Sequence, residues 1–325
     1  MQKHNNLTWK EAFQKSPGPK NWREAGILFV KGICMGSADI IPGVSGGTIA
    51  LIVGIYEKLI DAIQSVNTEA IFSAIKLNLK NTLQIVHIRF LLSLLLGIAT
   101  AILSLTHLIH YLLDNHPVHI WSFFLGLIAA SAIAISKNIP KWSVVEFTGV
   151  LLGTLGGYLI TGLIPAQTPE TWWFVMFSGM IAICAMILPG ISGAFILLIM
   201  GKYQYVTSAL KNPFTTDNII IIVTFLIGCV IGILGFSRVL NYLLKKHHNF
   251  TITFLIGLMI GSLRKVWPWK ETLETITIRD KVYVLREQNI LPQSYDSAFF
   301  IACLLIIIGF IFVLLLERLA NKREL

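Results

Sequence analysis

The chain has 325 residues, of which 55% are apolar and 13% are charged, with a formal net charge of +9. Soluble domains carry about 25% charged residues, so this composition and the mean hydropathy of +0.72 exclude an ordinary soluble protein and indicate an integral membrane protein. The basic residues lie in short loops between apolar runs, where they set membrane orientation, so we expect no nucleic-acid partner.

The first 24 residues are polar and lack the features of a cleaved signal peptide, namely a short apolar core followed by small residues. We expect residues 1–24 to form a cytoplasmic N-terminal segment. The 4 cysteines lie within apolar runs and form no C-x-x-C pair, which is typical of buried free thiols. The sequence therefore predicts no disulfide, no metal site and no cofactor.

Six apolar runs are long enough, or nearly so, to cross a bilayer. They cover residues 90–113, 120–135, 144–164, 219–244, 252–266 and 299–316. Two further apolar segments, residues 25–55 and 172–201, each carry a Pro-Gly pair near the centre. Pro and Gly break a helix, and hydrocarbon tolerates the freed backbone groups only where they line a cavity or are buried in protein. Each of these segments either crosses the bilayer or returns as a re-entrant helical hairpin.

The two broken segments are copies of one another. The motif P-G-V-S-G-G, which begins at Pro42, returns as P-G-I-S-G-A at Pro189, 147 residues later. Around this motif, 12 of 28 aligned residues are identical. The repeat continues at an offset of 131, which places Gly97 on Gly228. A helix break made twice, at corresponding positions, is the best sequence indication of a transporter's binding site.

The positive charges predict the orientation of the chain. If both broken segments are re-entrant and the N-terminus is cytoplasmic, the basic residues of loops 56–89 and 136–143 fall inside. The loops at 114–119 and 165–171, which hold no Lys or Arg, then fall outside. Three spans separate the two hairpins, so the first enters from the cytoplasm and the second from outside. This is the arrangement of inverted-topology repeats, and it places both termini in the cytoplasm.

The expected fold is an all-α polytopic membrane protein with two inverted-topology repeats. Each repeat holds a re-entrant hairpin broken at Pro-Gly, and the chain has about six full transmembrane helices. In chain order we expect a cytoplasmic segment 1–24, a first repeat 25–141 (hairpin 25–55, amphipathic helix 57–87, two spans), a connecting span and loop 142–171, an inverted second repeat 172–266, an extracytoplasmic loop 267–297, and a last span with a cytoplasmic tail 298–325.

The loop before the last span fits the positive-inside rule poorly. Residues 264–297 fall outside, yet they hold six Lys or Arg residues against five Asp or Glu. The alternation of residue types over 275–285 predicts a small β-hairpin. A folded loop with a net charge near zero weighs less on orientation than a short basic loop.

The hairpin breaks carry the candidate binding groups. If S-G-G-T at residues 45–48 begins the second half-helix, its unpaired N–H groups and the positive end of the helix dipole favour a phosphate or a carboxylate. The hydroxyls of Ser45 and Thr48 add donors, and Ser192 and Gly193 would supply the same groups from the opposite face. The alternative is that Ser45 and Ser192 only cap their helices.

Two charged residues lie in the first arm of the first hairpin. Lys31 and Asp39 align with Ser178 and Met186, so the second copy lacks these charges. Ionisable residues within membrane segments are costly and usually functional. Lys31 could pair with a phosphate, and Asp39 could carry a proton or hold Lys31. The alternatives are a structural ion pair between the two, or Lys31 extending to the membrane interface.

Arg238 lies toward the inner end of its span and aligns with His107, which lies toward the outer end of its own. The two residues could lie at opposite entrances to one pathway. Arg suits such a position because its guanidinium can contact a phosphate in a bidentate manner. The alternative is that Arg238 is an ordinary positive anchor at the inner interface.

The run K-G-I-C-M-G-S-A-D-I-I-P-G-V-S-G-G-T-I-A-L-I-V-G-I-Y-E, residues 31–57, resembles the signature of the bacterial polyprenyl-phosphate transporter family. The resemblance implies a plasma-membrane flippase that moves undecaprenyl phosphate from the outer to the inner leaflet, so that this lipid carrier is recycled in cell-wall synthesis. It implies that the head group is held by Pro42, Gly43, Ser45, Gly46, Gly47 and Thr48, with Asp39 and Lys31 as charged neighbours. In the second copy Ala194 and Phe195 replace Gly47 and Thr48, which weakens the case for direct phosphate contact there.

Two other functions stay open at this point. One is an undecaprenyl-pyrophosphate phosphatase, but S-G-G-T has no following His and no preceding E-x-x-x-E run to supply a general acid or base, so we expect no enzyme. The other is a carrier or channel for a small soluble anion, which needs a closed aqueous pathway rather than a lateral opening to the bilayer. A proton or sodium ion could be coupled to transport, and the oligomeric state is not predicted.

Overall fold

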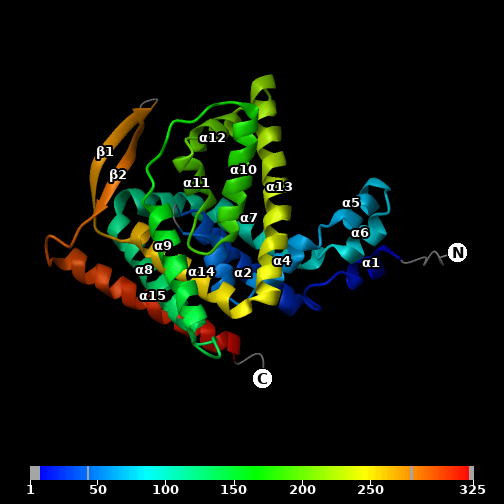
Figure 1. The fold of residues 1–325 in the computed structure, drawn as a ribbon, viewed down its shortest axis with the longest axis horizontal. Helices are drawn as coiled ribbons and strands as arrows, with labels where there is room; N and C mark the ends of the chain where they lie inside the picture. Colours follow the sequence, from blue (N-terminus) through cyan, green and yellow to red (C-terminus); the bar gives the residue numbers. More distant parts are fainter. Residues whose placement is uncertain (1–7, 42–43, 279–280, 322–325) are drawn as a thin grey trace.

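The computed structural model of the chain describes residues 8–41, 44–278 and 281–321. Within these residues the helices are α1 Trp9–Lys15, α2 Trp22–Asp39, α3 Gly46–Ile52, α4 Tyr56–Gln64, α5 Thr68–Ile75, α6 Leu79–Ile85, α7 Ile88–Asn115, α8 Pro117–Ser136, α9 Val144–Thr161, α10 Trp172–Ile187, α11 Gly193–Ile199, α12 Tyr203–Lys211, α13 Thr216–Lys246, α14 His248–Val266 and α15 Ser297–Asn321. The strands β1 Lys270–Ile278 and β2 Lys281–Asn289 pair antiparallel, which confirms the predicted β-hairpin. Figure 1 shows the helices gathered in one bundle, with the strands along one flank.

Six helices are long and apolar enough to cross a membrane, namely α7, α8, α9, α13, α14 and α15, which confirms the six predicted spans. The all-α polytopic fold is confirmed with them. Each of the two broken segments forms a pair of shorter packed helices, α2 with α3 and α10 with α11.

The bundle has two ends, because consecutive spans run in opposite directions. The chain reverses between α7 and α8 at His116, and between α13 and α14 at His247. We call one end the α4–α6 end, since these three short helices precede the start of α7 there. The other is the β-hairpin end, where α9 and α14 finish and β1 follows α14 (Figure 1).

The segment expected to form one amphipathic helix over 57–87 forms three short helices instead, α4, α5 and α6. Asn67 caps α5 by accepting the Ala70 N–H, and Asn78 caps α6 by accepting the Asn81 N–H. Leu77 has a positive φ of 57°, which ends the preceding helix. Apolar residues recur at helical spacing in this segment, but the caps at Asn67 and Asn78 interrupt the helix.

Corresponding helices of the two halves pack in corresponding pairs. α2 packs on α7, as α10 packs on α13. A Cβ added to Gly97 would lie 2.1 Å from the Phe29 carbonyl oxygen, and one added to Gly228 would lie 2.0 Å from the Met176 carbonyl oxygen. Both helix pairs therefore approach so closely that only glycine fits, and the contacts fall at positions related by the sequence offsets of 131 and 147.

The same relation holds for the two remaining helix pairs, α9 with α14 and α15 with α8. A Cβ on Gly153 would lie 2.1 Å from the Phe254 carbonyl oxygen, and one on Gly309 would lie 2.2 Å from the Phe123 carbonyl oxygen. Phe123 and Phe254 are related by the offset of 131, so α9 and α15 stand in the same relation to their partners. In its packing against a neighbouring helix, α9 therefore corresponds to α15.

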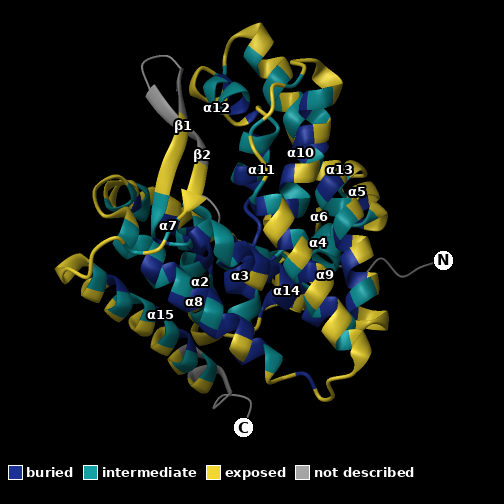
Figure 2. Ribbon diagram, turned by 60° about the vertical axis from the view of Figure 1, so that its left-hand side comes forward, coloured by how far each residue is buried: buried dark blue, intermediate teal, exposed yellow. Residues whose placement is uncertain are grey.

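The buried core surrounds the short helix α3 at the centre of the bundle (Figure 2). Ile41, Val44 and Ile49 are at most 6% exposed and belong to one apolar cluster with side chains from α8 and α14. By contrast α13 and α15 expose many large apolar side chains, such as Leu226 and Ile307, as expected for surfaces that face lipid. The first broken hairpin is therefore enclosed by protein, which is where a helix break is tolerated.

Candidate functional site

The first hairpin is held by two charged side chains of α2, one at each end of α3. Asp39 Oδ1 accepts a 2.7 Å hydrogen bond from the Gly46 N–H, the first residue of α3. Lys31 Nζ donates a 2.6 Å hydrogen bond to the Val53 carbonyl, the C-cap of the same helix. The two charges are about 12 Å apart along α2, since eight residues separate them. Lys31 and Asp39 thus stabilise the two ends of α3, where orphan backbone groups need partners.

The two hairpin breaks meet directly. Ser45 Oγ lies 3.1 Å from the carbonyl oxygens of both Met186 and Leu188, at the C-terminal end of α10, and donates to them. Thr48 Oγ1 accepts a 2.8 Å hydrogen bond from the Gly190 N–H. Ser45 is 1% exposed and Thr48 is fully buried. The N-terminal end of α3 therefore joins the C-terminal end of α10, which brings opposite ends of two helix dipoles together.

Close approach at this junction depends on glycine. A Cβ added to Gly47 would lie 2.4 Å from the Ile187 carbonyl oxygen, and one added to Gly46 would lie 2.5 Å from an Asp39 carboxylate oxygen. Gly190, on the other hairpin, has a φ of +86°, which L side chains rarely adopt. Gly47 is thus required by backbone contact and Gly190 by backbone conformation, whereas Gly46 leaves room for the Asp39 carboxylate.

The second hairpin is capped differently. Ser192 is the N-cap residue of α11 but makes no side-chain capping hydrogen bond, whereas Ser45 accepts the Gly47 N–H at 3.1 Å. A Cβ on Gly193 would lie 2.7 Å from the Ala182 carbonyl oxygen, so this glycine allows α11 to pack on α10. The capping role weighed for both serines therefore fits Ser45 and does not describe Ser192.

The anion-binding groups of the first break are engaged by the protein itself in this conformation. The Gly46 and Gly47 N–H groups donate to Asp39 and Ser45, and the Ser45 hydroxyl donates across the junction. A hydrogen bond to a charged partner contributes about 1.5–3 kcal/mol. A phosphate can bind the Gly46 N–H only by taking the place of the Asp39 carboxylate.

Three of the predicted site residues are not among the contacts described above. Pro42 and Gly43 lie outside the described residues. Arg238 is exposed on α13, and among the described residues nothing forms a hydrogen bond or ion pair with it. The buried residues beside it, Ser237 and Asn241, pack toward α4 instead. These contacts test neither a role of Arg238 at the entrance to a pathway nor the alternative that it is a positive anchor at the interface.

A buried polar network that sequence reasoning missed fastens α4 to α13. The Asn241 amide donates to Asp61 Oδ1 at 2.8 Å and to the Gln64 side chain, and Gln64 donates to the Ser237 carbonyl at 2.9 Å. Asn241 is 5% exposed, so these bonds replace water for a buried amide. Polar residues recur at helical spacing in both helices and could have been noticed in the sequence, but which of them pair with one another depends on the tertiary fold. Among the described residues, no group of three or more His, Cys, Asp or Glu gathers as metal ligands would.

Two cavities border the hairpins from opposite ends of the bundle. At the α4–α6 end, a cavity of about 390 Å³ is lined by Lys31, Lys58 and His87, among others. At the β-hairpin end, a cavity of about 740 Å³ reaches Phe195 of α11. The junction between Ser45 and Gly190 lies between these two regions of the bundle, and both cavities carry basic side chains.

Comparisons with known proteins show the family of the chain. A family model described as undecaprenyl phosphate translocase-like matches residues 35–282. The chain is 41% identical over 301 residues to the polyprenyl-phosphate transporter of Vibrio cholerae, covering 90% of this chain and 96% of that protein. It is 30% identical over 314 residues to the polyprenyl-phosphate transporter of Staphylococcus aureus, covering 92% of this chain and 98% of that protein. No solved structure matches the chain. The chain belongs to the undecaprenyl phosphate translocase-like family.

Proposed function

We propose that this protein is a flippase that carries undecaprenyl phosphate from the outer to the inner leaflet of the bacterial plasma membrane, for reuse in cell-wall synthesis. One observation carries the proposal: two broken helices meet through Ser45, Thr48 and Gly190 between basic cavities at opposite ends of the bundle. Family membership supports the same substrate, because both relatives are named polyprenyl-phosphate transporters.

The proposed orientation has the α4–α6 end and both termini in the cytoplasm. The basic loops at 56–89 and 136–143 lie at that end, as the positive-inside rule requires. The matching glycine contacts of the two halves support inverted-topology repeats, and they support a first repeat that extends through α9, beyond the boundary at 141 expected from the sequence. Each repeat then holds one hairpin and three spans.

In this proposal, the phosphate passes the junction of the hairpins while the prenyl chain stays in lipid. The proposed head-group contacts are Pro42, Gly43, Ser45, Gly46, Gly47 and Thr48, with Lys31, Asp39, Ser192, Gly193 and Arg238 along the path. The Asp39 carboxylate accepts the hydrogen bond of the Gly46 N–H, so it acts as an internal substitute for the phosphate. Arrival of the phosphate displaces Asp39, and its departure lets Asp39 return. A proton or sodium ion that neutralises Asp39 would favour the exchange.

The test is leaflet transfer of a fluorescent polyprenyl phosphate in liposomes that contain the purified protein. We expect transfer by the wild-type protein and a large loss in Lys31→Ala, because Lys31 lines the inner cavity and holds the C-terminal end of α3. Lys137→Ala is the matched control, since Lys137 is exposed at the same end and should tolerate the change.

The same liposomes separate the competing functions. Phosphate release from undecaprenyl pyrophosphate without leaflet transfer would contradict the proposal and favour a phosphatase. Uptake of a small soluble anion without lipid transfer would favour an anion carrier. Transfer that does not depend on Lys31 would keep the function and remove this residue from the path.

Inverted topology has its own test. In a variant without the native cysteines Cys34, Cys184, Cys229 and Cys303, single cysteines are placed at Asn67 and Gln167. Asn67 lies between α4 and α5, and Gln167 lies in the loop before α10. We expect a membrane-impermeant thiol reagent to label them from opposite sides of the membrane. Labelling of both from one side would contradict the topology.

A further inference from the structure

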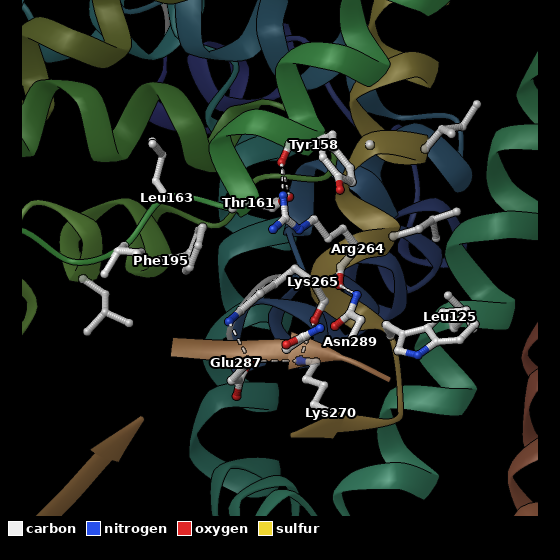
Figure 3. A pocket seen from close by; sticks show the side chains of 18 of the residues that line it. Leu125, Tyr158, Thr161, Leu163, Phe195, Arg264, Lys265, Lys270, Glu287 and Asn289 are labelled. Carbon is white, nitrogen blue, oxygen red and sulfur yellow. Dashed lines mark hydrogen bonds and ion pairs between the residues drawn. The ribbon is translucent and has the colours of Figure 1, made fainter. Parts of the chain in front are cut away.

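The cavity at the β-hairpin end has walls from both repeats and from the strands (Figure 3). Its volume of about 740 Å³ is ample for a phosphate head group with part of an attached chain. The walls come from the C-terminal ends of α9 and α14, from α11, and from the parts of β1 and β2 nearest the bundle. Because α11 is the second arm of the second hairpin, the cavity leads from the outside toward the junction of the hairpins.

An ion-paired cluster lies in this cavity, and sequence reasoning did not single it out. Glu287 Oε2 lies 3.3 Å from Lys265 Nζ and 3.4 Å from Lys270 Nζ. Their side chains are 28%, 23% and 12% exposed, so all three are largely withdrawn from water. Lys270 also lies over the ring of Trp121, at 4.5 Å, and Lys265 lies over the ring of Phe195, at 5.1 Å. One carboxylate is thus shared between two ammonium groups.

Arg264 adds a third positive charge on the same wall. Its guanidinium lies over the Tyr158 ring at 4.3 Å and donates to the Tyr158 carbonyl at 3.3 Å. A guanidinium has five N–H donors, and within the described residues this is the one hydrogen bond that the Arg264 guanidinium makes. Figure 3 shows Arg264 and Lys265 side by side on α14, facing the cavity. The cluster therefore carries three cations and one acid.

These cations are not needed for the packing that the two repeats share. At the offset of 131, Arg264 and Lys265 align with Ile133 and Ala134 at the other end of the bundle, on α8. α8 packs on α15 as α14 packs on α9, without any charge at these positions. Withdrawing cations from water costs free energy. Their presence at one end alone therefore indicates a role in binding at that end.

We infer that this cavity is a binding site for a phosphate monoester. Glu287 forms ion pairs with Lys265 and Lys270 until the phosphate displaces it. The inference rests on the proposed function, because the phosphate is that of the lipid captured from the outer leaflet. A phosphate monoester has up to two negative charges and three acceptor oxygens, so it can engage both lysines and Arg264, whereas one carboxylate cannot. Glu287 keeps the lysines paired while no lipid is bound.

The walls of the cavity fit a lipid rather than free phosphate. Leu163, Ile164 and Leu198 line it beside the charged cluster. The outward face of α9 exposes Leu151, Leu155 and Leu159, which are more than half exposed. A prenyl chain can therefore leave the cavity across α9 and remain in the bilayer while its phosphate reaches Arg264.

The experiment measures binding of a polyprenyl monophosphate to the protein in nanodiscs. We expect affinity to fall at least about tenfold in the variant that combines Arg264→Gln with Lys265→Gln, since two charge-assisted contacts are lost. We expect affinity to rise several-fold in Glu287→Gln, because the competing carboxylate is gone. Glu271→Gln is the matched control, because Glu271 is exposed on the paired strand β1, opposite Gln288, and does not line the cavity.

The Glu287 variant separates displacement from a structural role. If Glu287 only fastens the β-hairpin to α14, Glu287→Gln lowers or leaves unchanged the affinity, and the inference is overturned. Inorganic phosphate and a short-chain prenyl phosphate serve as competitors. Competition by the prenyl phosphate at much lower concentration assigns the site to a lipid, whereas equal competition by inorganic phosphate contradicts the lipid assignment.

Leaflet transfer, measured in parallel, keeps the two proposals distinct. Wild-type transfer together with unchanged binding in the Arg264 and Lys265 variant would overturn the cavity site and leave the flippase intact. Absence of wild-type transfer, with the expected binding changes, would overturn the flippase and leave a phosphate-monoester site.

Discussion

The two broken hairpins have the same backbone plan but are held by different chemistry. The Val53 carbonyl, after α3, accepts from the charged Lys31 side chain of the same hairpin. Its counterpart in the second hairpin, the Met200 carbonyl, accepts instead from the hydroxyl of Thr168 in the loop before α10. At the other end of each short helix, Asp39 engages Gly46 in the first hairpin, while Met186 stands at the matching position in the second.

This difference indicates that the first hairpin carries its own charges and the second depends on its neighbours. Two cations from other elements lie against the second hairpin. Lys265, on α14, lies over the Phe195 ring of α11. Lys202, the N-cap residue of α12, lies over the Phe174 ring of α10. A repeated backbone thus carries unequal chemistry, with a carboxylate and a lysine inside the first hairpin and a basic cavity beside the second.

The largest expected effect comes from Gly47, where the two hairpins touch. In Gly47→Ala the new Cβ would lie 2.4 Å from the Ile187 carbonyl oxygen, so the backbones must separate. We expect leaflet transfer to be lost and thermal unfolding to shift downward, because overpacking of this kind costs about 1–3 kcal/mol or more.

Two substitutions serve as controls for this effect. Gly26→Ala adds a Cβ that meets nothing within 4 Å, so transfer and stability should be retained. Ala194→Gly, at the matching position of the second hairpin, removes a methyl group without creating a clash. If Gly47→Ala transfers lipid like the wild type, the junction of the hairpins is not part of the path.

The hydroxyls of the two breaks should differ in importance. Ser45→Ala with Thr48→Val removes the hydrogen bonds to Met186, Leu188 and Gly190 and leaves buried backbone groups without partners. We expect binding of lipid phosphate to weaken about tenfold or more, since the phosphate loses two hydroxyl donors and a hydrogen bond to a charged group contributes about 1.5–3 kcal/mol.

Ser192→Ala is the matched comparison, because Ser192 makes no side-chain capping hydrogen bond. We expect a change of no more than about twofold in binding, equivalent to about 0.4 kcal/mol. Equal losses in the two variants, with expression unchanged, would show that the breaks contribute alike and would contradict the asymmetry.

Asp39→Asn tests the exchange of the built-in carboxylate for phosphate. The amide oxygen still accepts the Gly46 N–H, but the negative charge is lost. We expect stability to fall by about 1 kcal/mol, the difference between a charged and a neutral hydrogen bond, while affinity for lipid phosphate rises a few-fold. Weaker lipid binding in a folded Asp39→Asn protein would mean that Asp39 supports the phosphate rather than competing with it.

The smallest expected effect is a pH dependence at the cavity beside the second hairpin. Burial lowers the pKa of Lys270 to about 8, and the charge of Glu287 opposes this shift. Burial raises the pKa of Glu287, but the charges of Lys270 and Lys265 outweigh it, so that pKa lies below its usual value. Glu287 therefore stays ionised while Lys270 loses its proton as the pH rises through about 8.

Because an anion prefers protonated Lys270, affinity for a phosphate monoester should fall about two- to threefold between pH 7.5 and 9. The phosphate itself is already fully ionised in this window. Lys270→Gln should remove the dependence, since its side chain does not titrate. A pH dependence of the same size in Lys270→Gln would assign the titration to another group.

The sequence predicted the fold where local rules decide and missed features that need distant contacts. The lengths of the apolar runs were sufficient to predict the six spans. The repeated motif identified both helix breaks without any knowledge of tertiary contacts. The pairing of Asp39 with Gly46 across a helix break could not be read from spacing, because it depends on how α2 and α3 pack against each other. The amphipathic segment failed as one helix because Asn67 and Asn78 compete locally for backbone N–H groups.

The contacts at the two breaks could be predicted only in part, for the same reason. Ser45 and Thr48 stand out because their motif recurs, but their partners on α10 and at Gly190 come from the tertiary fold. Arg264, Lys265 and Lys270 had a visible signal, since they belong to the loop that violated the positive-inside rule. That violation has a physical reason in the structure, because Lys265 and Lys270 pair with Glu287 and Arg264 lines the same cavity.

The most direct test uses a polyprenyl phosphate that carries a photoreactive group next to its phosphate. After illumination of the protein in nanodiscs, the cross-linked peptides are identified by mass spectrometry. If the phosphate travels through the junction of the hairpins, the cross-links fall on α3, on residues 187–193, and on the cavity side of α14. Cross-links confined to the lipid-facing surfaces of α13 and α15 would contradict a path between the two broken helices.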